Sequence, residues 1–111
     1  MPEPRLTSDL WVAAYRKRLE MFGIAVFVAA RGDATAGAVL VKLATLDGQA
    51  EAFHRTFDLG TGDRVWDSLA KGAEVDVDAA IDRQKSFDPD LWVIEVEDRD
   101  GRHMLGEDGL N

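Results

Sequence analysis

Residues 38–57 read AVLVKLATLDGQAEAFHRTF, which predicts two strands joined by a tight turn. Apolar side chains alternate between Ala38 and Leu46, which predicts a strand with Lys42 on one face and, on the other, Val39, Val41 and Leu43. The Asp47-Gly48 pair is the strongest short hairpin signal in the chain. We therefore expect Gln49 to Phe57 to turn back and pair antiparallel with the first strand.

A helix and a strand are expected upstream of this hairpin. Thr7-Ser8-Asp9 is typical of a helix N-cap, and large apolar side chains recur every three or four residues as far as Phe22. Gly23 then ends the helix. The run from Ile24 to Ala30 is apolar on both faces, which is typical of a central strand whose two faces are both covered.

Two helices are expected downstream of the hairpin. A short one, ended by Gly72, fits the spacing of Val65, Trp66 and Leu69. A second helix is predicted from about Asp76 to Phe87. Asp88-Pro89-Asp90 breaks it, because proline disfavours a helical conformation in the residue before it.

The C-terminal third is expected to complete the sheet. Leu91 to Glu97 predicts a strand with one apolar and one acidic face, and Arg102 to Leu105 predicts a last short strand after a turn. The whole pattern is an N-terminal helix, a three-strand segment, two helices and a C-terminal strand or hairpin. It indicates an α+β fold with a small antiparallel sheet of about four or five strands.

Size and composition fit a single globular domain. The chain has 111 residues, 46% of them hydrophobic, and we expect one domain over residues 1–111 with a short loose tail from about residue 106. The absence of cysteine excludes disulfides and fits a cytoplasmic location. No secretion signal is evident, and the longest uncharged run, residues 21–30, is far shorter than the ~20 apolar residues of a spanning helix.

The charge of the chain is concentrated in its last third. The formal net charge is −8; residues 1–73 hold nine acidic and nine basic residues, whereas residues 74–111 hold twelve acidic and four basic ones. An acidic surface repels phosphate backbones and anionic lipids. We therefore expect neither nucleic acid nor membrane as a partner.

Several segments carry a resemblance to a known family. They read LWVAAY at residues 10–15, RGDA at 31–34, AGA at 36–38 and FDPDLWVIEVED at 87–98, followed by Gly101-Arg102-His103. Together they resemble a family of small alphaproteobacterial proteins classified only as a domain of unknown function, family 1491. The resemblance implies an uncharacterised bacterial domain and brings no activity, ligand or catalytic residue with it.

Acidic side chains near the C-terminus are the sharpest candidates for chemistry. Glu95 and Glu97 are two residues apart on one strand, so their side chains share a face, and Asp98 and Asp100 follow in the adjoining turn. Such carboxylates can bind a hard divalent cation. Alternating acidic residues are also what any hydrated sheet face contains, and we favour that interpretation.

Two other features are candidates for interaction. Arg16, Lys17 and Arg18 form a basic cluster on the first helix, which we interpret as a hydrated face or as a surface that meets the acidic C-terminal third within one chain or across a dimer. Trp66 is a large anchor expected on an exposed short helix.

The sequence favours binding over catalysis. No serine lies in a Gly-x-Ser-x-Gly motif, and neither histidine has a second histidine at metal-ligand spacing. We predict a non-enzymatic domain that binds a protein partner or a small ligand, with no cofactor and with a homodimer as one form. A divalent-cation-binding domain or metal-dependent enzyme is the alternative, and an acidic mimic of nucleic acid is a third interpretation.

Overall fold

The computed structural model describes residues 6–106. Two helices and five strands follow in the order α1 (Ser8–Met21), β1 (Ala25–Ala30), β2 (Val39–Ala44), β3 (Gln49–Phe57), β4 (Arg64–Ala73), α2 (Glu74–Phe87) and β5 (Trp92–Glu97). The expected α+β class is confirmed. The tail expected after residue 106 lies outside the described residues.

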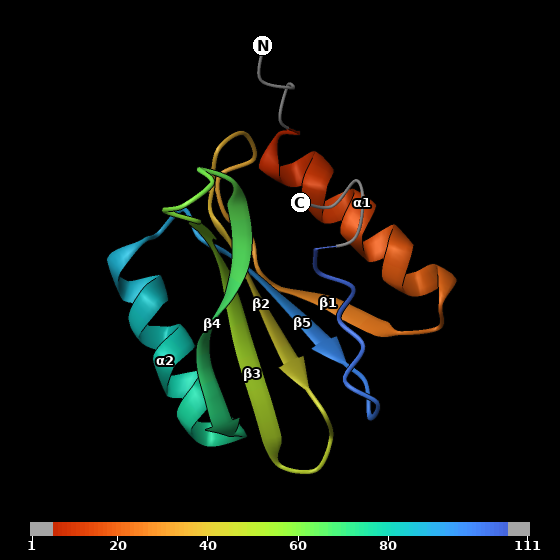
Figure 1. Ribbon diagram of the computed structural model, residues 1–111. Helices are drawn as coiled ribbons and strands as arrows, with labels where there is room; N and C mark the ends of the chain where they lie inside the picture. Colours follow the sequence, from red (N-terminus) through yellow and green to blue (C-terminus); the bar gives the residue numbers. More distant parts are fainter. Residues whose placement is uncertain (1–5, 107–111) are drawn as a thin grey trace.

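The strands form one mixed sheet in the order β1-β5-β2-β3-β4 (Figure 1). The hairpin expected around Asp47-Gly48 is present, with β2 and β3 antiparallel. The expectation of an antiparallel sheet is wrong at one place, because β5 lies parallel to β2. The reason is the long connection through β3, β4 and α2, which returns the chain to the end of the sheet where β2 starts and inserts β5 between β1 and β2.

Each face of the sheet is covered by one helix (Figure 1). On the α1 side, Trp11, Tyr15 and Leu19 pack against side chains of β2 and β5, including Val41 and Ile94. On the α2 side, a second buried cluster contains Leu40, Ala50, Ala52, Val77, Ile81, Leu91 and Val93. The small Ala50 and Ala52 of β3 lie beneath α2. All six residues of β2 are buried, because β2 lies beneath both clusters.

Two predicted elements are wrong. The short helix expected around Trp66 is part of the long strand β4, because pairing with β3 satisfies this backbone and a register shift near Phe53 disturbs the simple alternation of side chains. The strand expected from Arg102 to Leu105 is irregular chain. It packs Met104 and Leu105 against the α1-side core, and the Tyr15 hydroxyl donates to the His103 carbonyl oxygen at 2.6 Å.

The prediction of a central strand at residues 24–30 is wrong. The uncharged strand β1, predicted to be central, lies at an edge of the sheet, with the side chain of Phe27 51% exposed. The strand β5, which carries Glu95 and Glu97, lies between two others, and both of its faces contribute to a core. The helix expected over residues 76–87 is confirmed and starts two residues earlier, at Glu74.

Candidate functional site

A cleft of about 590 Å³ opens at the upper end of the sheet in Figure 1. The elements that meet there are the start of α1, the start of β2, the end of β3, the start of β4 and the end of α2. Apolar lining comes from residues such as Leu6 and Leu40, whereas Ser8, Thr35 and Thr56 supply hydroxyl groups. A mixed lining of this kind is typical of a small-molecule site.

Arg55 is the central cation of this cleft. Its guanidinium carbon lies 4.7 Å from the ring centroid of Trp11 and 4.7 Å from that of Trp66. The two indoles are themselves 5.3 Å apart, and Trp11 also stacks on Tyr15 at 4.8 Å. The aromatic rings therefore fix the orientation of the planar guanidinium, whose N–H donors match carboxylate and phosphate geometry.

The electrostatic balance of the cleft differs from that of the whole chain. Arg55 and Arg64 line it together with His54, and the acidic residue in the lining is Asp88. The first residues of α1 also line it, but their backbone N–H groups are already bonded: those of Ser8 and Asp9 donate to the carbonyl oxygens of Thr35 and Ala34, and that of Leu10 donates to the Asp9 carboxylate. A chain of net charge −8 thus has a cleft whose lining is net positive.

The loop between β1 and β2 forms one rigid wall. The Asp33 carboxylate accepts hydrogen bonds from the backbone N–H groups of Thr35 and Ala36, and the Ser8 hydroxyl donates to the Gly37 carbonyl oxygen at 2.6 Å. Glycine is required at 37 because a Cβ atom there would lie 2.4 Å from the carbonyl oxygen of Asp90. This wall is therefore fixed by backbone contact.

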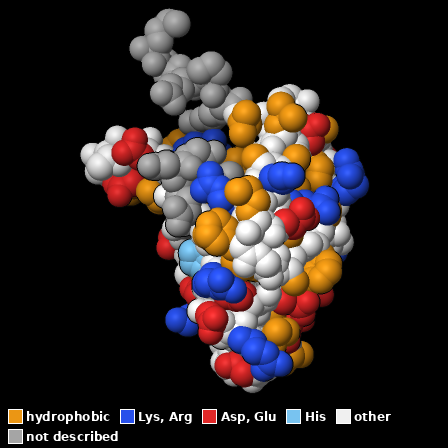
Figure 2. Space-filling model, turned by 90° about the vertical axis from the view of Figure 1, so that its right-hand side faces the viewer, with side chains coloured by type: hydrophobic (Ala, Val, Ile, Leu, Met, Phe, Trp, Pro, Cys, Tyr) orange, Lys and Arg blue, Asp and Glu red, His pale blue; other side chains and the backbone are white. Residues whose placement is uncertain are grey.

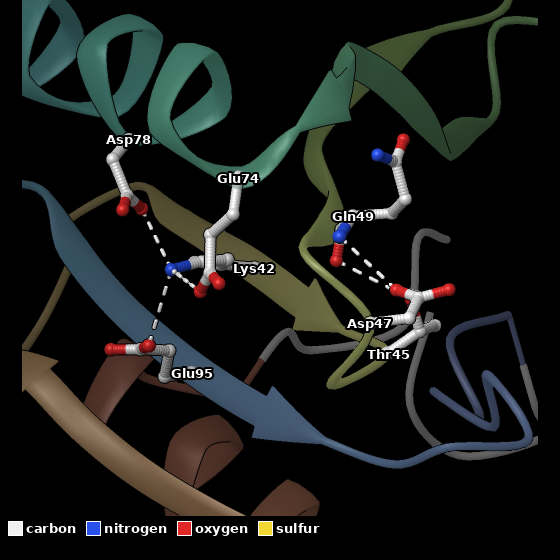
Figure 3. A network of polar contacts seen from close by, with 7 residues as sticks. All are labelled: Lys42, Thr45, Asp47, Gln49, Glu74, Asp78 and Glu95. Atoms are coloured by element: carbon white, nitrogen blue, oxygen red, sulfur yellow. Dashed lines mark hydrogen bonds and ion pairs between the residues drawn. The ribbon is translucent and has the colours of Figure 1, made fainter.

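A second polar site lies on the α2 side of the sheet (Figure 3). The Lys42 ammonium is within 2.7 Å of Glu74 and of Asp78 on α2, and 3.3 Å from Glu95 on β5. Burial by itself lowers the pKa of Lys42, but hydrogen bonds to Asp78 and Glu74 and the charge of Glu95 outweigh it and raise the pKa. Lys42 therefore stays protonated at neutral pH and fastens α2 to the sheet.

The four acidic candidates do not converge on one point. Glu95 contacts Lys42, whereas the Asp98 carboxylate accepts from the Arg102 side chain at 2.9 and 3.1 Å, and hydrogen bonding to Arg102 lowers the pKa of Asp98. Glu97 is half-buried and Asp100 is exposed. Among residues 6–106, no group of three or more histidine, aspartate or glutamate side chains has an arrangement that could hold a metal ion, so the cation-binding alternative has no support.

The basic cluster lies on the outer side of α1. Arg16 and Lys17 are exposed, and Arg18 is half-buried in the last turn. Figure 2 shows this side of the molecule, where lysine and arginine side chains are scattered among acidic and hydrophobic ones. Within residues 6–106, these three side chains do not line the cleft, and no ion pair joins them to Glu95, Glu97, Asp98 or Asp100.

Sequence reasoning singled out Trp66 but missed Arg55. Trp66 lies on β4 and is half-buried against the α1-side core, so the expectation of an exposed residue on a short helix is wrong. Arg55 sits directly opposite Trp66 in the β3–β4 register. The sequence shows an arginine near the end of the strand that follows the Asp47-Gly48 turn, but its aromatic partners come from two other elements.

Comparisons with known proteins agree on one family. The family model described as "Protein of unknown function (DUF1491)" matches residues 6–106. No curated protein matches the chain. Within residues 6–106, neither helix has the length and apolar character needed to cross a membrane.

Solved structures of similar proteins share the fold. A crystal structure of a DUF1491 family protein from Caulobacter crescentus is 46% identical, with a TM-score of 0.84 over 93% of this chain and 97% of that one. An NMR structure of a DUF1491 family protein from the same organism is 45% identical, with a TM-score of 0.81 over 95% and 96%. The protein Atu0922 from A. tumefaciens, known from a solution structure, is 26% identical in sequence, with a TM-score of 0.71 over 85% of this chain and 86% of that one.

Proposed function

Because the chain belongs to the DUF1491 family of proteins of unknown function, we propose a function from its own surface: it is a binding module for a small organic anion with a flat apolar body. The cleft at the upper end of the sheet is the proposed site. The observation that carries the proposal is the guanidinium of Arg55, held at 4.7 Å from two indole rings within that cleft.

The residues of the cleft suit a ligand with two parts, an anionic group and an apolar body. An arginine whose plane is fixed by aromatic rings suits a carboxylate or phosphate group that lies in that plane. Nε and Nη2 of Arg55 are buried, so the anion would approach the guanidinium from the side of the cleft. Arg64 lines the same cleft and adds a second positive charge. Apolar lining residues whose side chains are more than half exposed, Leu6 and Phe57, then favour a flat apolar body over a fully hydrated ion.

Fluorescence titration with 2-naphthoate tests this proposal. The alcohol 2-naphthalenemethanol, which has the same ring system and no negative charge, is the matched control. Trp11 and Trp66 flank Arg55, so binding should quench tryptophan emission. We expect saturable binding of naphthoate and at least about tenfold weaker binding of the alcohol, because a charge-assisted hydrogen bond contributes about 1.5 to 3 kcal/mol.

Variants separate a specific site from general adsorption. Arg55→Gln should weaken naphthoate binding about tenfold or more, whereas Arg16→Gln on the outer side of α1 should leave it unchanged. Equal binding of the acid and the alcohol, or equal loss in both variants, would contradict the proposal. Inorganic phosphate is the third probe, and phosphate binding as tight as that of naphthoate would show that the apolar body is irrelevant.

A further inference from the structure

The two edges of the sheet are built differently. The edge strand β4 carries Arg64, Asp67 and Lys71, and its pairing with β3 is interrupted by a register shift. Charged side chains and bulges are devices that keep an edge strand from pairing with another chain. The edge at β4 is therefore protected.

The opposite edge strand, β1, lacks charged side chains. Its six residues read Ala-Val-Phe-Val-Ala-Ala from Ala25 to Ala30, with no charge and no proline. One side of β1 pairs with β5, and no described strand pairs with the other side. Phe27 is 51% exposed, and the exposed Met21 and Phe22 lie at the end of α1, a few residues before the strand. An uncharged edge with exposed apolar side chains is a template for strand pairing.

We propose that β1 pairs antiparallel with β1 of a second copy of this chain, so that the two sheets continue across a twofold axis. Such an interface is isologous, meaning that each residue pair occurs twice and the strand must complement itself. The sequence of β1 meets that requirement, because Val26-Phe27-Val28 reads the same in both directions and is flanked by Ala25 and Ala29. Self-complementarity favours a second copy over an unrelated peptide.

The fold also limits the register of this pairing. With the twofold axis perpendicular to the sheet, α1 of both copies lies on the same face, so directly opposite residues must point to the same side. Any residue placed opposite its own copy meets that condition, and the palindrome Val26-Phe27-Val28 favours Phe27 opposite Phe27 of the partner copy, which also sets Val26 against Val28. The bulge in β1 lies beyond Val28 and bounds the paired segment.

This pairing would place the uncharged strand β1 in the interior of a continuous sheet, the position that its composition predicts. Phe27 and the side of the strand it occupies would be covered by the same residues of the second copy, and the outer backbone groups would be hydrogen-bonded. Paired edge strands alone bury a small area, so we expect a dissociation constant in the micromolar range, about 1 to 100 µM.

Sedimentation equilibrium with light scattering tests the proposal on the full chain. The wild type should be dimeric at about 200 µM and dissociate on dilution. Phe27→Lys places two lysines opposite each other and should yield a monomer, as should Phe27→Glu, since like charges directly opposite are destabilising. The control Val65→Lys, at a partly exposed position on β4, should leave the dimer intact.

Mixing the variants tests the register itself. Equal amounts of Phe27→Lys and Phe27→Glu should form a heterodimer, whereas Val65→Lys mixed with Phe27→Glu should not. A wild type that stays monomeric at about 200 µM overturns the proposal. So does a dimer that survives both Phe27 substitutions, or a mixture that shows no heterodimer when circular dichroism shows both variants folded.

Discussion

The strands β1 and β5 are neighbours in the sheet, but the uncharged strand lies at the edge and the acidic strand lies in the interior. β1 is uncharged and lies at an edge, whereas β5 carries Glu95 and Glu97 and lies between β1 and β2. Phe27 of β1 and Glu95 of β5 are directly paired, and the glutamate is the more buried of the two. A central position therefore does not require an uncharged strand.

The difference is explained by what lies next to each strand. Glu95 pairs in register with Lys42 of β2, and the ammonium of Lys42 reaches its carboxylate. The charge of Glu95 is therefore compensated, and its side chain remains 34% exposed. β1 has no comparable neighbour on its outer side among the described residues. The acidic strand β5 is therefore tolerated between two other strands because Lys42 compensates the charge of Glu95.

Placing an uncompensated charge on each strand should give the largest contrast. Val93 of β5 is 4% exposed and packs in the α2-side core, so Val93→Glu should lower the free energy of unfolding by about 4 kcal/mol or more. Phe27→Glu on β1, where the side chain is half-exposed, should cost about 1 kcal/mol or less in the monomer. Urea unfolding at a concentration where both variants are monomeric measures the difference, and equal costs would refute this explanation.

Removing the cation that compensates β5 should have the next largest effect. Lys42→Met should lower the free energy of unfolding by about 2 to 3 kcal/mol, less than for a fully buried ion pair, because Glu74, Asp78 and Glu95 are 39%, 51% and 34% exposed and can hydrate. Adding Glu95→Gln should cost less in the Lys42→Met background than in the wild type. A double-mutant cycle by urea unfolding measures this coupling, and additive losses would show that the two residues act independently.

The segment after β5 should give the smallest effect, a pH dependence through His103. Burial lowers the pKa of His103 below its ordinary value of 6.5, and the charge of Glu51 only partly opposes this shift. The unfolded chain then binds the proton more readily, so this stabilisation is complete above about pH 6.5 and is lost as the pH falls toward the folded-state pKa.

His103→Gln checks this dependence, because a glutamine oxygen can still accept the Leu105 N–H that now binds Nδ1 at 3.0 Å. Urea unfolding at about pH 7.5 and about pH 5.5 should show a smaller stability loss on acidification in the variant than in the wild type. An identical loss in both proteins would mean that other groups carry the pH dependence.

Local patterns predicted most of the elements. The N-cap residues and apolar spacing of α1, the Asp47-Gly48 turn and the break at Pro89 all act within a few residues along the chain, and each marks a boundary found in the structure. The prediction of a helix around Trp66 was wrong because the strand there depends on pairing with β3, whose bulge disturbs the local pattern of side chains. Arg55 was missed for a related reason, since its indole neighbours come from α1 and β4.

Residue patterns alone were enough to predict the α+β class, both long helices and the central hairpin, and similarity alone identified a family of unknown function. These features depend on short-range periodicity, turn chemistry and direct similarity. The three-dimensional arrangement was needed to show that β5 inserts parallel to β2, that Lys42 faces three carboxylates and that Arg55 lies between two indoles in a cleft. Each of these arrangements joins side chains from elements far apart in the chain, and their proximity follows from strand order, which local residue patterns do not specify.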